Sequence, residues 1–64
     1  MFKWKRIGDI EINDLITWWG YDIPLLDKKI VNGKWIITVI DPVEKIQKDF
    51  KYNLTDELMI LIED

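Results

Sequence analysis

The 64-residue chain contains no histidine, cysteine, serine or alanine. Without an imidazole or a thiol, neither a Ser-His-Asp triad nor a cysteine nucleophile can be assembled. Structural zinc is excluded as well, because such sites use Cys or His ligands, so only oxygen-ligated ions such as calcium or magnesium remain. The lack of cysteine also rules out disulfides and leaves the redox compartment undetermined.

Long hydrophobic runs are also missing. No stretch approaches the roughly 18 apolar residues that mark a membrane-spanning helix. The N-terminus, MFKWKR, is basic, but Gly8, Asp9 and Glu11 interrupt the apolar segment that a secretion signal requires. We therefore expect a cytoplasmic protein that forms one small domain over residues 1–64.

Apolar and aromatic side chains dominate what is present. They make up 48% and 12% of the chain, with four tryptophans and a net charge of −3. Such a short chain can bury only a small hydrophobic core and is expected to be marginally stable alone, so association with a second copy or a partner would stabilise it. The abundance of isoleucine and lysine without alanine resembles AT-rich coding and, with the small size, suggests a phage or mobile-element origin.

Three segments have the patterns of strands. Residues 2–6 (FKWKR) alternate apolar and basic side chains, and residues 58–62 form a short apolar run between acidic residues. The pair Asn32-Gly33 separates residues 28–31 from residues 34–40 and predicts a β-hairpin with a type I′ turn. Residues 8–12 either extend the first strand, or Gly8-Asp9 bends the chain in a bulge or turn that leads to a short hairpin.

Two segments have the patterns of helices. Asn13 or Asp14 is a possible N-cap for residues 15–19, with Gly20 as the C-cap. Asp41, Pro42 and Glu44 form a capping-box arrangement at the head of a second helix that Asn53 would end. Its apolar stripe is Val43, Ile46 and Phe50, and Glu44 with Lys48 and Lys45 with Asp49 are pairs of opposite charge four residues apart.

The predicted fold class is α+β, with a small antiparallel sheet and two helices on one face. The element order β-α-β-β-α-β is that of the ferredoxin-like split βαβ fold, with sheet order 4-1-3-2. A small α+β meander is the alternative. Apolar side chains would remain on the uncovered sheet face, which predicts a dimer, a partner or a lid over them: Ile36, Ile40, Met59 and Leu61.

Tryptophan content favours a binding surface, because this residue often anchors interfaces. On the predicted helix over residues 15–19, the adjacent side chains of Trp18 and Trp19 point in directions about 100° apart. One of them, or Tyr21, is therefore expected to be exposed. The predicted contact residues are Trp4, Lys5, Arg6, Trp19 and Tyr21. The leading hypothesis is a non-catalytic protein-binding module that inhibits or modulates a larger host protein by occlusion, and the alternative is a self-assembling homodimer.

Nucleic acid binding is a weaker hypothesis. RNA-recognition domains share the predicted element order, and Trp4 and Trp35 occupy roughly their base-stacking positions. Basic residues would lie on neighbouring strands: Lys3, Lys5, Arg6, Lys28, Lys29 and Lys34. The sequence pI near 4.8 argues against phosphate contacts.

Acidic residues also occur in pairs: Asp9 with Glu11, Asp56 with Glu57, and Glu63 with Asp64. These lie at expected element ends and have no EF-hand spacing. We therefore expect no enzyme activity, no cofactor and no metal site.

Overall fold

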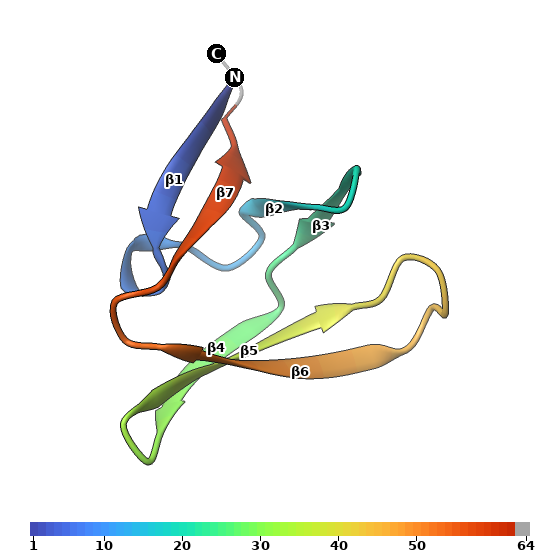
Figure 1. Ribbon diagram of the computed structural model, residues 1–64. Helices are drawn as coiled ribbons and strands as arrows, with labels where there is room; N and C mark the ends of the chain where they lie inside the picture. Colours follow the sequence, from blue (N-terminus) through green and yellow to red (C-terminus); the bar gives the residue numbers. More distant parts are fainter. Residues whose placement is uncertain (63–64) are drawn as a thin grey trace.

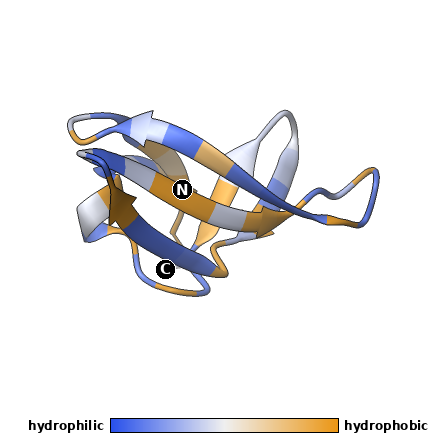
Figure 2. Cartoon of the chain, turned by 90° about the horizontal axis from the view of Figure 1, so that it is seen from below, coloured by the Kyte–Doolittle hydropathy of each residue, from blue (hydrophilic) through white to orange (hydrophobic). Residues whose placement is uncertain are grey.

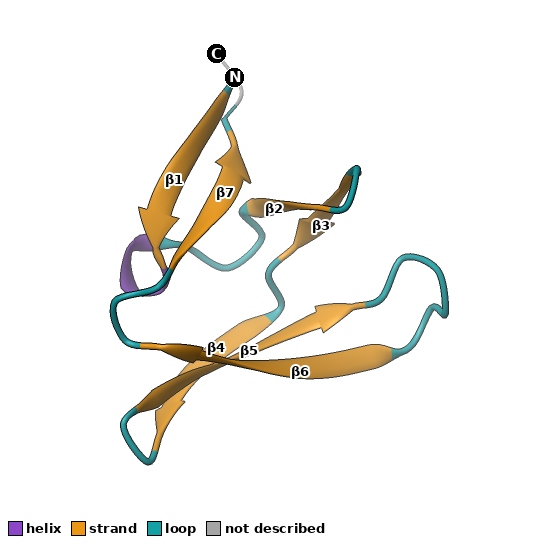
Figure 3. Cartoon of the chain, in the orientation of Figure 1, coloured by secondary structure: helices purple, strands orange, loops and turns teal. Residues whose placement is uncertain are grey.

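The computed structural model describes residues 1–62 and is built almost entirely of antiparallel strands (Figures 1 and 3). A single 3₁₀ turn, η1 (Ile7–Asp9), is the only helical element in that range. The strands are β1 (Phe2–Arg6), β2 (Leu15–Trp18), β3 (Tyr21–Pro24), β4 (Asp27–Val31), β5 (Lys34–Ile40), β6 (Gln47–Asn53) and β7 (Glu57–Leu61).

The strands form two sheets. The first sheet has the order β1-β7-β2-β3, and the second has the order β4-β5-β6. The chain crosses from the first sheet to the second at Leu25 and Leu26 and returns between β6 and β7. Apolar and polar residues alternate along several strands (Figure 2), as expected when each sheet buries one face.

The hydrophobic core lies between the sheets. Its buried members come from both sheets and from the segments around η1 and between the sheets: Ile7, Ile10, Ile16, Ile23, Leu25, Ile37, Val39 and Ile60. Half-buried side chains pack around them: Trp18, Trp35, Phe50, Tyr52 and Leu58. The two helices expected to cover one sheet are absent from residues 1–62, and the second sheet takes their place.

The predicted strands are confirmed. Residues 2–6 form β1, residues 58–61 lie in β7, and these two strands pair, as they would in the expected sheet order. The β4–β5 hairpin has Val31 opposite Lys34, with Asn32 and Gly33 at φ 51° and 74° as a type I′ turn requires. The sheet order 4-1-3-2 is wrong, because β1 and β5 belong to different sheets.

The helix predicted over residues 15–19 is wrong. Leu15–Trp18 is strand β2, which pairs with both β3 and β7. Gly20 serves a two-residue hairpin turn and does not end a helix. Isoleucine, threonine and tryptophan all favour strands, and pairing on both sides satisfies the backbone of a segment too short to make a stable helix.

The helix predicted from Asp41 to Asn53 is also wrong beyond its first turn. Asp41 accepts the backbone N–H groups of Val43 and Glu44, each at 2.8 Å, as a helix cap would. Lys45 then adopts a left-handed backbone with φ 64°, which stops the turn. Residues 47–53 instead pair with β5 along all seven positions of β6. The α+β and ferredoxin-like assignment is therefore replaced by a nearly all-β fold.

The turn predicted at Gly8-Asp9 forms, but it leads neither to a longer first strand nor to a hairpin with β1, which pairs with β7. The η1 turn bends the chain directly after β1, and Ile10 donates its backbone N–H to the Ile7 carbonyl at 3.1 Å. Both isoleucines are thereby fully buried. No helix in residues 1–62 has the length and apolarity to cross a bilayer.

Apolar side chains also occupy the side of the first sheet that faces away from the core. Cross-strand partners point to the same side, so the register places five of them together: Phe2, Trp4, Leu15, Met59 and Leu61. We call this set the outer face. Met59 and Leu61 lie on the side away from the core but are half-buried, so the bare face predicted around them is only partly seen. Ile36 and Ile40 lie on the outward side of the second sheet among polar neighbours.

Candidate functional site

A groove of about 400 Å³ lies between the β2–β3 turn and the β5–β6 turn. Both turns project to the same side of the molecule (Figure 1). Aromatic and aliphatic side chains make up most of the lining, with one small charged cluster. We call this the turn groove, and its lining residues are Trp18, Trp19, Tyr21, Ile23, Val39, Asp41, Pro42, Val43, Glu44, Lys48 and Phe50.

The two adjacent tryptophans have different roles in this groove. Trp18 is half-buried, and its ring meets Phe50 edge-on with a centroid separation of 4.5 Å. Trp19 follows at the tip of the hairpin and is 89% exposed. Trp18 therefore joins the two sheets, whereas Trp19 is presented to solvent beside the groove.

Trp19 also has an unfavourable backbone. It occupies the first central position of the hairpin turn with φ 51°, and Gly20 follows at φ 85°. Asn32-Gly33, in the other type I′ turn of the chain, has the residue pair that this geometry prefers. A left-handed conformation costs a bulky L-residue roughly 1–2 kcal/mol. Folding gains almost nothing in return, since the indole is hardly covered.

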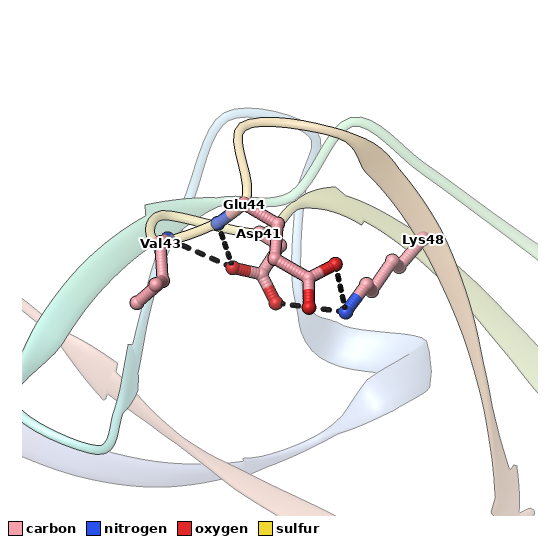
Figure 4. A network of polar contacts seen from close by, with 4 residues as sticks. All are labelled: Asp41, Val43, Glu44 and Lys48. Atoms are coloured by element: carbon pink, nitrogen blue, oxygen red, sulfur yellow. Dashed lines mark hydrogen bonds and ion pairs between the residues drawn. The ribbon is translucent and has the colours of Figure 1, made fainter.

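Asp41, Glu44 and Lys48 form a charged cluster within the lining of the groove (Figure 4). Lys48 Nζ donates to Asp41 Oδ2 at 3.1 Å and lies 3.0 Å from Glu44 Oε2. Backbone N–H donation from Glu44 and Val43, followed by Lys48, holds the pKa of Asp41 below its usual value. Hydrogen bonds to Glu44 and Asp41 raise the pKa of Lys48. The predicted Glu44–Lys48 pair thus forms, although across a turn and not on a helix.

The predicted contact residues are split between two surfaces. Trp19 and Tyr21 both line the turn groove. Trp4, Lys5 and Arg6 lie on β1, at the opposite edge of the first sheet from β3. Three strand spacings, about 14 Å, separate these edges. Trp4 is 58% exposed on the outer face.

Two of the three basic residues on β1, Lys5 and Arg6, have acidic neighbours. Lys5 Nζ lies 3.9 Å from Asp14 Oδ2, and Arg6 lies opposite Glu57 in the ladder. These contacts leave β1 less basic than its sequence suggests. The structure therefore does not join Trp4, Lys5 and Arg6 to Trp19 and Tyr21 in one site.

Several groove residues were missed from the sequence. The sequence favours Trp19 over Trp18 as a contact residue and predicts Phe50 on the apolar stripe of a helix. The alternation of Lys48, Phe50 and Tyr52, which all point inward from β6, was the available signal. Nothing local indicated that Pro42 and Val43 would lie near Trp19, because that proximity depends on how the two hairpins pack.

The aromatic pair suggested for nucleic acid stacking does not form. Trp4 lies on the outer face of the first sheet, whereas Trp35 packs against the core from the second sheet. Lys28 Nζ lies 5.5 Å from the Trp35 ring centroid and donates to the carbonyls of Ile7 and Gly8 at 3.2 and 2.9 Å. The basic strands also do not meet, since β1 and β4 are in different sheets.

The two acidic pairs that lie within residues 1–62, Asp9 with Glu11 and Asp56 with Glu57, belong to no cluster suited to a metal. Over residues 1–62, no group of three or more carboxylates is close enough to hold an ion. Asp56 instead accepts the backbone N–H of Asn53 at 2.7 Å and closes the β6–β7 turn. The pair Glu63 and Asp64 lies outside the described residues.

Comparison with protein-family models, curated proteins and solved structures finds no match for this chain. What the chain does therefore has to follow from the chemistry of its own surfaces.

Proposed function

We propose that the protein is a non-catalytic binding module whose turn groove receives an extended segment of a larger protein. Trp19 is the observation that carries this proposal. Its indole is exposed, and its backbone is held in a conformation that tryptophan disfavours. Strained residues that the fold itself does not need are concentrated at ligand-binding sites.

The shape and lining of the groove suit a peptide. Its volume, about 400 Å³, accommodates a few side chains and falls within the range of ligand pockets. Tryptophan and tyrosine are the residues that most often dominate binding energies at interfaces. Grooves lined by aromatic side chains receive extended, proline-rich segments, which lose little entropy on binding.

A module of this size would act by covering a surface of its partner. We propose that it inhibits or modulates a larger host protein by occlusion, which agrees with the phage or mobile-element origin suggested by its composition. No step of this action requires a catalytic group or a cofactor.

Selection of peptides from a random displayed library on the immobilised protein tests the proposal. Selected peptides should bind the wild-type protein and lose at least ten-fold in affinity for Trp19→Asn, which fits the left-handed turn. Trp4→Thr is the matched control, because it removes an exposed tryptophan outside the groove. Equal affinity for wild type and Trp19→Asn, with loss in Trp4→Thr, would overturn the assignment of the groove.

Self-assembly through the outer face is the second candidate function. The register gathers Phe2, Trp4, Leu15, Met59 and Leu61 on one side of the first sheet, and two of these are more than half exposed. A two-fold dimer would bury this set against its own copy. The melting temperature would then rise with protein concentration in the wild type and not in Trp4→Thr. A wild-type monomer at all concentrations eliminates this candidate.

A further inference from the structure

We infer that the peptide bound in the turn groove presents an arginine side chain, whose guanidinium stacks on Trp19 and pairs with Glu44. This inference deepens the proposed function and rests on it. It starts from the charge of the groove wall, where two carboxylates, Asp41 and Glu44, face a single ammonium, Lys48. One negative charge is left over in an otherwise apolar lining.

The two carboxylates are not equally available to a ligand. Asp41 is committed to the fold, because it accepts two backbone N–H groups and the Lys48 ammonium. Within residues 1–62 the Glu44 carboxylate pairs with Lys48 alone, and its side chain is 58% exposed. A carboxylate has two oxygens and about four acceptor positions, so Glu44 keeps acceptor positions for an incoming donor. Lys48, held between both acids, is not available to attract an anion.

Aromatic faces provide the second half of the recognition. The exposed indole of Trp19 and the ring of Tyr21, which is 46% exposed, line the same groove. Cations are attracted to such faces, and tryptophan is the strongest partner. The same chemistry already occurs inside this protein, where the ammonium of Lys28 lies 5.5 Å from the Trp35 ring centroid.

Arginine fits this arrangement better than lysine. Its planar guanidinium can stack on an indole while its edge donates two hydrogen bonds to a carboxylate. A lysine ammonium is a compact, strongly hydrated charge that does not stack. The groove volume, about 400 Å³, exceeds what one guanidinium needs, and apolar neighbours in the peptide would fill the remainder against Pro42 and Val43.

Titration of isotope-labelled protein with matched capped peptides, Ac-Gly-Val-Pro-Xaa-Pro-Val-Gly-NH₂, tests the inference. The central residue is arginine, lysine or citrulline, the last being a neutral analogue of arginine. We expect the arginine peptide to shift the Trp19 indole N–H signal and to bind at least ten-fold more tightly than the citrulline peptide, as loss of a charge-assisted hydrogen bond implies. Added salt should reduce that difference.

Glu44→Gln should remove the preference for arginine over citrulline, whereas Glu57→Gln, the same substitution outside the groove, should leave it intact. Equal affinity of the arginine and citrulline peptides for the wild-type protein overturns the inference, as does stronger binding of the lysine peptide. Library-selected peptides that need Trp19 but contain no arginine would overturn the inference and support the proposed function. If no selected peptide depends on Trp19, both fail.

Discussion

Trp18 and Trp19 are adjacent in the sequence, but their substitution should have opposite effects on the stability of the fold. Replacing Trp19 should raise the free energy of unfolding, and replacing Trp18 should lower it. Trp19→Asn replaces a left-handed tryptophan by a residue that the type I′ turn prefers, which should release about 1 kcal/mol of backbone strain. The lost burial is small, because only about a tenth of the side chain is covered. At ~25 cal/mol per Å² and ~25 Å² of covered surface, this loss is about 0.6 kcal/mol.

Trp19→Asn should therefore raise the free energy of unfolding by roughly 0.4 kcal/mol, which corresponds to about 2–3 °C in melting temperature for a domain of this size. Trp18→Ala should instead cost roughly 2 kcal/mol, because its half-buried ring packs on the core and against Phe50. Urea unfolding followed by far-ultraviolet circular dichroism measures both without relying on tryptophan fluorescence. A destabilisation of Trp19→Asn by more than about 1 kcal/mol would refute the reasoning, since it would show that the fold needs the indole.

Three further substitutions test the turn at Asp41 and the difference between the buried and exposed sides of β5. The lowered pKa of Asp41 means that its contribution to stability is present above the unfolded value of 3.8 and is lost as pH falls through the folded pKa. Asp41→Ala should therefore be less stable than wild type at pH 7, and acid titration of the two by circular dichroism should bring their stabilities closer at low pH. A constant difference down to pH 2 would contradict this. On β5, Ile37→Ala should cost about 3 kcal/mol and Ile40→Ala less than about 1 kcal/mol, because Ile37 is fully buried and Ile40 is exposed. Equal losses in urea unfolding would mean that the core does not lie between the sheets.

Sequence patterns predicted correctly those elements whose conformation depends only on residues close by in the sequence. Alternation in residues 2–6 and the pair Asn32-Gly33 predicted a strand and a hairpin that the structure contains. These features depend on side-chain period and turn conformation, which a short window determines. Trp19 and Tyr21 are both exposed, although the prediction that one of them would be exposed assumed a helix where the structure has a hairpin.

The predictions were wrong where a pattern in a few residues was used to predict the structure of a longer segment. Asp41 does cap a turn, but a cap determines only the first turn of a helix, and Lys45 ends that turn after four residues. The strand that follows is stabilised by pairing with β5, which is a long-range interaction. Both predicted helices were short enough for sheet pairing to outweigh helix propensity.

The turn groove could not have been predicted as a site. Its walls come from two hairpin ends that are distant in the sequence, and their proximity requires the packing of the two sheets. The predicted contact residues combine Trp4, on the first strand, with Trp19, at the end of an expected helix. The observed sheet order places them at opposite edges.

The four tryptophan indole N–H signals provide the most direct test of the turn groove as the binding site, because each reports on a different environment. Trp18 and Trp19 line the groove, Trp35 packs on the core, and Trp4 lies on the outer face. A library-selected peptide titrated into labelled protein should shift the Trp18 and Trp19 signals and leave those of Trp4 and Trp35 in place. A shift confined to Trp4 would contradict the account and assign binding to the outer face.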